Sequence, residues 1–141
     1  MSGLRLPSVG ERLPEWRIGP FDAAALRAYA EASGDDNPIH LDEDLARAIG
    51  FPAPPVHGMK LLAAFEPMLI AWRRDLFIAR LAGKFVQPVV RGEAVILTGR
   101  VLRASAEEGV FLRLLATGES RAPAIVGEAL MTAPPRLGRA R

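Results

Sequence analysis

The segment from Gly58 to Trp72 reads G-M-K-L-L-A-A-F-E-P-M-L-I-A-W, and its side chains are almost all apolar. Only Lys60, Glu66 and Pro67 interrupt the apolar run. A helix that is apolar on nearly all sides belongs in the interior of a protein. Pro67 has no backbone N–H to donate and is expected to kink the helix. The sequence therefore predicts a long, buried central helix with a kink.

Downstream of Asp75, four segments have the composition of β-strands and are separated by glycine-containing turns. An antiparallel sheet that wraps around the apolar helix is the simplest way to cover it. We therefore expect an α+β hot-dog fold, in which the sheet surrounds the long central helix. The expected strands are Ile78–Val90, Ala94–Ala104, Val110–Thr117 and Ala124–Ala133, with a further strand near Glu11–Ile18.

The part upstream of the central helix is expected to consist of helices and loops. Phe21–Ser33 repeats apolar residues at helical spacing, and Pro20 and Gly34 stand where a helix begins and ends. The turn-forming string G-D-D-N-P follows at residues 34–38, before a short helical piece at Asp42–Ile49. We therefore expect polar side chains to be presented on a loop between two helices.

The composition is that of one globular domain. The chain has 141 residues, half of them hydrophobic, which suits a single domain over 1–141 with a core over about 10–133 and a basic tail at 134–141. The absence of cysteine excludes disulfides, thiolate metal sites and a cysteine nucleophile. Eighteen Lys and Arg against 16 Asp and Glu give a net charge of only +2, and the cations are dispersed along the sequence. We therefore expect no nucleic-acid partner.

Membrane segments are not expected either. No apolar run approaches the roughly 18 residues that cross a bilayer, and residues 1–10 lack the apolar centre of a signal peptide. The sequence thus predicts a cytoplasmic protein without a membrane partner.

The chain contains only two histidines, His40 and His57, and both lie in the loop-rich part. His40 follows Asp35 by five residues, and Pro38 stiffens the turn between them. A carboxylate and an imidazole that face one space can hold a water molecule and share its proton, as hydration of a double bond requires. The same spacing is also compatible with Asp35 capping the helical turn and His40 lying on the surface. From spacing alone, both interpretations stay open.

The surrounding string is more specific than the spacing. Residues 29–49 read Y-A-E-A-S-G-D-D-N-P-I-H-L-D-E-D-L-A-R-A-I, which closely resembles the hydratase signature of the MaoC-like (R)-specific enoyl-CoA hydratases and 3-hydroxyacyl-thioester dehydratases. The resemblance continues through P-V-H-G-M at 55–59, K-F-V-Q-P-V at 84–89 and G-E at 92–93. It covers most of residues 10–133.

The resemblance implies a role for each matching residue. Asp35 and His40 match the catalytic pair, which orients a water for addition to C3 of a trans-2-enoyl thioester and handles the proton at C2. Gly58 matches a backbone N–H at the start of the central helix, which stabilises the thioester oxygen as enolate character develops. Asn37 matches an element that orients the loop or a water, although an ordinary turn residue is an equal alternative. His57 is expected to be a structural histidine beneath the site.

Glu66 and Pro67 depart from the family pattern, in which this part of the helix carries small or apolar residues. Glu66 follows Gly58 by eight residues, about two turns, and so is expected on the same face. Hot-dog thioesterases place a catalytic carboxylate on this helix, so an acyl-CoA thioesterase that uses Glu66 is an alternative function. We also expect contributions to the substrate pocket from Phe65, Glu66, Trp72 and Lys84, the last near the phosphates of the carrier.

The resemblance also implies the partners. The substrate is an acyl thioester of coenzyme A or acyl carrier protein, and neither a cofactor nor a metal is expected. Because an antiparallel sheet leaves open edges, we expect a homodimer. Heterodimerisation with a related subunit is the other possibility, since two-subunit dehydratases occur in the family. In that case this chain would be a non-catalytic subunit.

Overall fold

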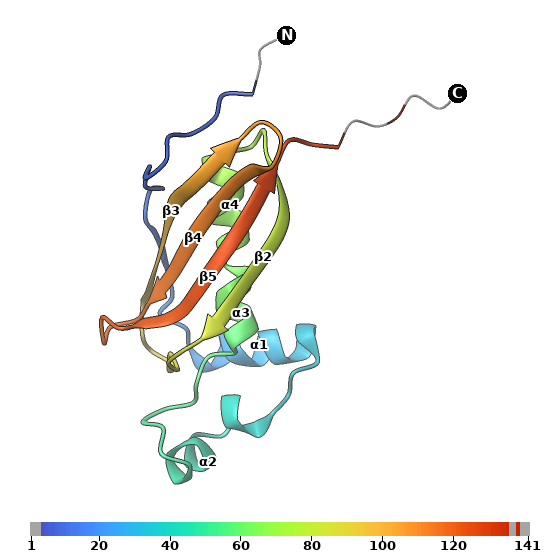
Figure 1. Cartoon of the computed structure of the whole chain (residues 1–141). Helices are drawn as coiled ribbons and strands as arrows, with labels where there is room; N and C mark the ends of the chain where they lie inside the picture. The colour runs from blue at the N-terminus through green and yellow to red at the C-terminus, as the bar shows by residue number, and fades with distance from the viewer. Residues whose placement is uncertain (1–3, 136–137, 139–141) are drawn as a thin grey trace.

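The sheet of this protein is antiparallel and has five strands in the order β1–β3–β4–β5–β2. A computed structural model describes residues 4–135 and 138. Figure 1 looks onto the outer face of the sheet, with the helices behind it. The strands are β1 (Trp16–Ile18), β2 (Phe77–Phe85), β3 (Val95–Ser105), β4 (Gly109–Thr117) and β5 (Pro123–Thr132).

Alternating side chains give the sheet an inner and an outer face. In β4, Leu112 and Leu114 are fully buried, whereas Arg113 between them is exposed. This period of two is what a strand with one covered face requires. The inner faces of β3, β4 and β5 supply much of the core, and the rest comes from the central helical segment.

The strand bounds differ from the predicted ones at two places. β2 ends at Phe85 instead of Val90, and Pro88 lies in the loop that follows, because proline cannot donate to a strand ladder. The strand predicted near Glu11–Ile18 is short, since Pro14 also lacks an N–H, and it contains only β1 with an isolated bridge between Arg12 and Arg100.

The central helical segment is split, so the prediction of one long helix is wrong in this detail. It consists of α3 (Gly58–Ala63) and α4 (Phe65–Trp72), which are separated at Ala64. Pro67 cannot bond to the carbonyl four residues earlier, and its ring crowds that carbonyl. At this point the helical turn is tighter than in an α-helix, because the N–H of Ala64 donates to the carbonyl of Leu61, three residues earlier, at 3.2 Å. The kink that Pro67 predicts is therefore a one-residue break.

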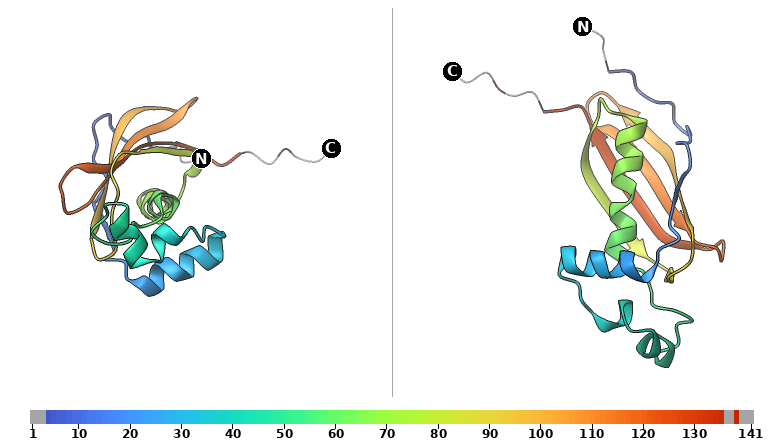
Figure 2. Two further views of the ribbon diagram at one scale, coloured as in Figure 1. Left: turned by 90° about the horizontal axis from the view of Figure 1, so that it is seen from below. Right: turned by 180° about the vertical axis from the view of Figure 1, so that it is seen from behind.

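The expectation that this segment is buried on all sides is also wrong. The sheet curves around one side of α3 and α4, and α1 and α2 lie beyond their N-terminal end (Figure 2). The opposite side is open, and there Met59 is 57% and Ile70 44% exposed. A sheet that curves around a helix is the hot-dog arrangement, but five strands cover only part of the helix.

The N-terminal helices are fixed by local caps. In α1 (Ala23–Ser33), the side chain of Asp22 accepts from the N–H of Ala25 at 2.8 Å, and Gly34 ends the helix with a φ of 78°. A 3₁₀ turn, η1 (Pro38–His40), and α2 (Glu43–Ala48) follow. These bounds agree with the predicted helix, loop and short helix.

Two predictions concern the ends of the chain and the membrane. The basic tail at 134–141 lies largely outside the described residues. Within the described part of the chain, every helix is too short or too polar to cross a bilayer.

Candidate active site

The loop that carries Asp35 is shaped by its own polar side chains. The N–H of Asp35 donates to the hydroxyl of Ser33 at 3.1 Å. The carboxylate of Asp35 in turn accepts from the N–H of Asn37 at 3.4 Å, and the amide oxygen of Asn37 accepts from the N–H of Ile39 at 3.1 Å. Such short-range bonds stabilise turns in place of a regular ladder. Asn37 thus occupies the cap of η1.

The loop brings Asp35 and His40 together. Nε2 of His40 lies 3.8 Å from a carboxylate oxygen of Asp35, and Nδ1 of His40 lies 2.8 Å from the carbonyl oxygen of Pro55. A carbonyl only accepts, so Nδ1 carries the hydrogen and Nε2 of the neutral ring has a free lone pair. Two proton acceptors therefore face one another across a gap that suits a bridging water. Half of the Asp35 side chain is exposed, so water can reach it.

His57 lies beneath this pair and is almost fully buried. Its Nε2 donates to the backbone carbonyl of Asp35 at 3.1 Å, and its ring stacks on that of His40 with centroids 3.9 Å apart. The rings of His57 and Tyr29 also pack against one another at an interplanar angle of 60°, with centroids 4.7 Å apart. His57 is thus in contact with the backbone of one member of the pair and with the ring of the other.

Burial keeps His57 neutral. Loss of solvation lowers the pKa of His57, and this effect outweighs the opposing hydrogen bond to Asp35. A neutral ring that donates from Nε2 has an acceptor at Nδ1, and this atom has no hydrogen-bond partner among the described residues. A neutral His57 therefore adds no charge beneath the ring of His40, on which it stacks.

The same three side chains could be considered as a metal site. Asp35, His40 and His57 offer donor atoms within 4.8 Å of one another. However, the two imidazole planes are only 24° from parallel, and the lone pairs of a ring lie in its plane. Stacked rings therefore direct their lone pairs side by side and not toward one ion. Nε2 of His57 already bonds to the backbone carbonyl of Asp35, so only Nδ1 of this ring could bind an ion without losing that bond.

A cavity of about 400 Å³ opens beside Asp35, and both Asp35 and Gly58 contribute to its wall, whereas His40 does not line it. Gly58 is the first residue of α3, where a backbone N–H has no acceptor within the helix. The ring of Phe85 lies against Gly58, so that a Cβ on Gly58 would be only 2.8 Å from it. The rest of the wall is mostly apolar. It includes Val56, Met59, Leu61, Val86, Pro88 and Ile125.

The structure does not place the other predicted pocket residues in this wall. Phe65 is fully buried in the core, and Glu66 is exposed on α4. Trp72 is half-buried at the far end of α4 and packs against the core. Lys84 lies on the outer face of the sheet, because it alternates with the inward-facing Phe85. None of these four residues lines the cavity beside Asp35.

Phe85 is the residue that reasoning from the sequence missed. It lies in the K-F-V-Q-P-V string at residues 84–89, in which the sequence points to Lys84 as a pocket residue. The signal was available, since neighbouring residues of a strand point to opposite faces. A cation on the outer face of β2 implies that its neighbour faces the helix.

Comparison with known proteins gives a consistent result over most of the chain. A family model described as a MaoC like domain matches residues 13–109. The match includes the loop with Asp35 and His40 as well as His57 and Gly58.

Relatives of known name extend the match. The (R)-specific enoyl-CoA hydratase of Aeromonas caviae is 32% identical over 120 residues, which are 81% of this chain and 87% of the relative. A mitochondrial 3-hydroxyacyl-[acyl-carrier-protein] dehydratase of Arabidopsis thaliana is 34% identical over 91 residues, 64% of this chain and 54% of the relative. The chain thus spans only about half the length of the Arabidopsis protein.

A solved structure shows the same fold. The (R)-hydratase from A. caviae involved in PHA biosynthesis superimposes with a TM-score of 0.79 and 29% identity, over 91% of this chain and 98% of that structure.

Proposed function

The chain belongs to the family of MaoC-like domains, and we propose that it hydrates trans-2-enoyl thioesters to (R)-3-hydroxyacyl thioesters or catalyses the reverse dehydration. The observation that carries this proposal is the pair of proton acceptors, Asp35 and His40, which lie 3.8 Å apart, with Asp35 in the wall of a cavity. The names of the relatives from Aeromonas and Arabidopsis support the reaction class.

The chemistry follows from the geometry of the pair. A water between Asp35 and Nε2 of His40 donates its hydrogens to both, which aims a lone pair of its oxygen at the substrate. As the oxygen adds to C3, the pair takes up one proton, and it returns one proton to C2. Water is thus added in full across the double bond, and the reaction needs no cofactor.

Gly58 has the complementary role. During addition to C3, negative charge develops on the thioester oxygen, which needs a hydrogen-bond donor. Gly58 lines the same cavity as Asp35 and is the first residue of α3, so its N–H has no acceptor within the helix, and a glycine lets the thioester approach the backbone closely. In this proposal His57 positions the pair and does not touch the substrate, because it is buried beneath them.

The proposal is tested with purified protein and crotonyl-CoA. Hydration removes the ultraviolet absorbance of the conjugated enoyl thioester, and chiral analysis of the product reports the configuration at C3. We expect Asp35→Asn and His40→Ala each to lower kcat/KM by about a hundredfold or more, since each removes one proton acceptor. Full activity in both variants would show that the pair is not catalytic.

Glu66→Gln serves as the matched control. Glu66 is exposed on α4 and absent from the cavity wall, so we expect the variant to hydrate at the wild-type rate. Release of free thiol instead of loss of the enoyl band would indicate a thioesterase. Absence of both signals with short and long acyl chains would indicate a non-catalytic subunit.

We further propose that two copies pair through the open side of α3 and α4. Monomeric proteins seldom expose large apolar patches, yet this side and the adjoining β2 expose several large apolar side chains. They are Met59, Ile70, Phe85 and Val86, each more than 40% exposed. Since Met59, Phe85 and Val86 also line the cavity, a partner on this face would enclose the substrate.

A further inference from the structure

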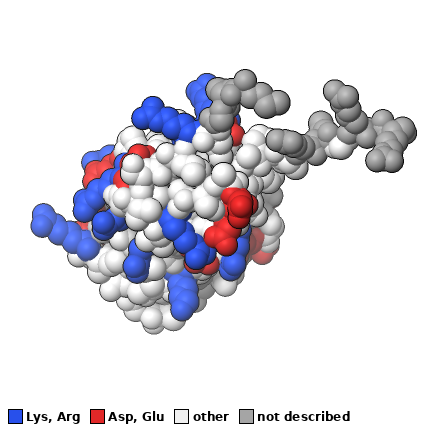
Figure 3. All heavy atoms as spheres, turned by 45° about the horizontal axis from the view of Figure 1, so that its top comes forward, with Lys and Arg blue, Asp and Glu red and all other residues white. Residues whose placement is uncertain are grey.

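The outer face of the sheet collects cations that are far apart in the sequence. The strand register places outward-facing residues of β2, β5, β4 and β3 in three rows. The first row is Arg80, Leu130, Phe111 and Arg103, the second Ala82, Glu128, Arg113 and Arg100, and the third Lys84, Val126, Leu115 and Thr98. We call this surface the cationic array. In Figure 3, Lys and Arg outnumber acidic residues on the visible face.

The arrangement is not one that stability alone favours. Arg100 and Arg113 lie directly opposite one another on neighbouring strands, and like charges at such positions destabilise a sheet. Glu128 is the single acidic residue of the three rows, and it pairs with Arg80 at 3.5 Å. The array therefore presents five cations to solvent against one carboxylate.

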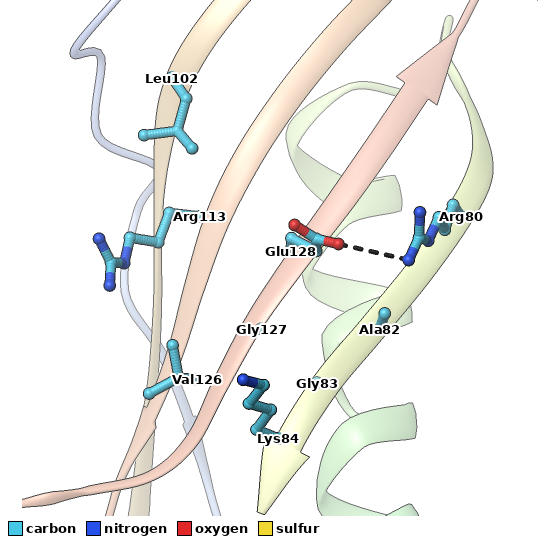
Figure 4. A pocket seen from close by; sticks show the side chains of 9 residues that line it. All are labelled: Arg80, Ala82, Gly83, Lys84, Leu102, Arg113, Val126, Gly127 and Glu128. Carbon is cyan, nitrogen blue, oxygen red and sulfur yellow. Dashed lines mark ion pairs between the residues drawn. The ribbon is translucent and has the colours of Figure 1, made fainter.

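The cationic array also contains a hollow and exposed apolar side chains. An open hollow of about 570 Å³ lies on the outer face of the sheet, where the small Ala82 stands between the longer side chains of Arg80 and Lys84 on β2 (Figure 4). Lys84, Arg80 and Arg113 stand around it, and Leu102 and Val126 contribute apolar surface. Leu102 is half exposed where β3 bulges. Cations thus surround apolar side chains, as at the rim and centre of a protein interface.

We propose that the cationic array is a docking surface for a protein partner that presents carboxylates around an apolar centre. A second copy of this face cannot be the occupant of a symmetric contact, because five cations would meet five cations. Nucleic acid fits less well, since the Glu128 carboxylate lies within the array and the one aromatic ring, Phe111, is covered by Arg103 at 4.0 Å. The positive charge of the array and its apolar side chains therefore favour an acidic protein with an apolar centre as the partner.

The size of the array indicates the strength of binding. From strand spacing and rise, it covers roughly 20 Å by 20 Å, about half of the ~800 Å² that each partner buries in a standard interface. We therefore expect a transient complex that weakens as salt is added, since exposed charges are screened beyond about 8 Å at physiological ionic strength.

The experiment uses the full chain and a labelled helical peptide with glutamates on both sides of a leucine stripe. Fluorescence anisotropy measures its binding to the wild type and to a triple variant with Arg80→Gln, Arg100→Gln and Arg113→Gln. We expect the triple variant to bind about tenfold more weakly, and the wild type to lose affinity with salt. The matched control removes three exposed cations elsewhere, by Arg5→Gln, Arg27→Gln and Arg74→Gln, and is expected to bind like the wild type.

Several outcomes would overturn the proposal. They are a dissociation constant above about 1 mM, equal weakening in the control variant, and equal binding of a peptide with the same composition in scrambled order. Tighter binding of duplex DNA or anionic vesicles than of the peptide would assign the array to another class of ligand. Should the triple variant fold poorly, Arg100→Gln alone relieves the repulsion with Arg113 and must still weaken binding measurably.

Discussion

At the scale of single residues, His57 connects the two members of the proposed pair. It donates to the backbone of Asp35 and stacks on the ring of His40, so that its position restrains both side chains. Burial lowers its pKa, and the ring is therefore neutral when the site is intact. A residue that acts through its neighbours should affect the rate more than substrate binding.

We predict that His57→Phe lowers kcat by about tenfold with little change in KM, because the ring can still stack but the bond to Asp35 is lost. The measurement is a Michaelis profile with crotonyl-CoA. His57→Gln keeps an amide donor and should recover part of the rate. A change confined to KM would contradict a positioning role.

The lowered pKa of His57 also predicts how stability depends on pH. The unfolded chain takes up the proton at a higher pH than the folded protein, so unfolding is favoured as pH falls below the ordinary value of about 6.5. His57→Phe cannot titrate and should lose less stability than the wild type between about pH 7.5 and about pH 5.5. Urea unfolding at both pH values checks this. The same loss in both proteins would show that His57 titrates normally.

Gly58 and Phe85 form the second residue-scale contact. A methyl group at position 58 would lie 2.8 Å from Phe85, but this ring is half exposed and can swing toward solvent. We predict that Gly58→Ala costs only about 1 kcal/mol of stability but lowers kcat/KM by about tenfold or more, since the methyl obstructs the N–H. Adding Phe85→Leu should restore stability without restoring activity. Wild-type activity of Gly58→Ala would remove Gly58 from the mechanism.

At the scale of elements, the end of α1 sets the position of Asp35. Gly34 has a φ of 78°, which L-residues adopt at a cost, and the next residue is already in the loop of the site. The C-cap of α1 is thus directly bonded to the residue that carries the site carboxylate. A substitution that changes the backbone conformation at Gly34 should therefore shift the side chain of Asp35.

We predict that Gly34→Ala destabilises the protein by about 1 kcal/mol, the cost of a left-handed conformation for a residue with a Cβ, and that it lowers hydratase activity. Space is not limiting, since no atom lies within 4 Å of such a Cβ. Gly50→Ala is the control, because Gly50 also has a positive φ and open space but follows the C-cap of α2, away from Asp35 in the sequence. Urea unfolding and crotonyl-CoA hydration are measured for both. Equal loss of activity in the two variants would contradict the link to Asp35.

At the scale of the whole molecule, the two faces of the sheet differ in character. On the inner side of the sheet lie α3 and α4, whose far side exposes apolar side chains such as Met59 and Ile70. The outer side of the sheet carries the cationic array. Apolar surface suits permanent pairing, and charge suits transient contacts. We therefore assign the two surfaces to different partners.

We predict that Ile70→Lys converts a dimer into a monomer, because it places a charge in the open side of α4, where Ile70 is 44% exposed. Leu102→Lys is the control, since Leu102 is 51% exposed on the outer face. Sedimentation velocity distinguishes the two. Dimerisation of Ile70→Lys, or dissociation of Leu102→Lys, would place the interface elsewhere.

Many features of the fold and of the site can be predicted from the sequence, because they depend on residues that are close together in the chain. The caps of α1, the turn from Ser33 to Ile39 and the break near Pro67 depend on bonds between residues at most a few positions apart. Alternation of apolar and polar residues likewise determines which face of β4 is buried. For the same reason, the proximity of Asp35 and His40 could be predicted.

Only the tertiary structure placed residues that are distant in the chain. The stacking of His57 on His40, the ring of Phe85 on Gly58 and the exposure of Glu66 depend on how separate elements pack. The cations from Arg80 to Arg113 look dispersed in the sequence, and strand register brings them onto one face. Register and packing are set by contacts summed over the whole core, which no local pattern contains.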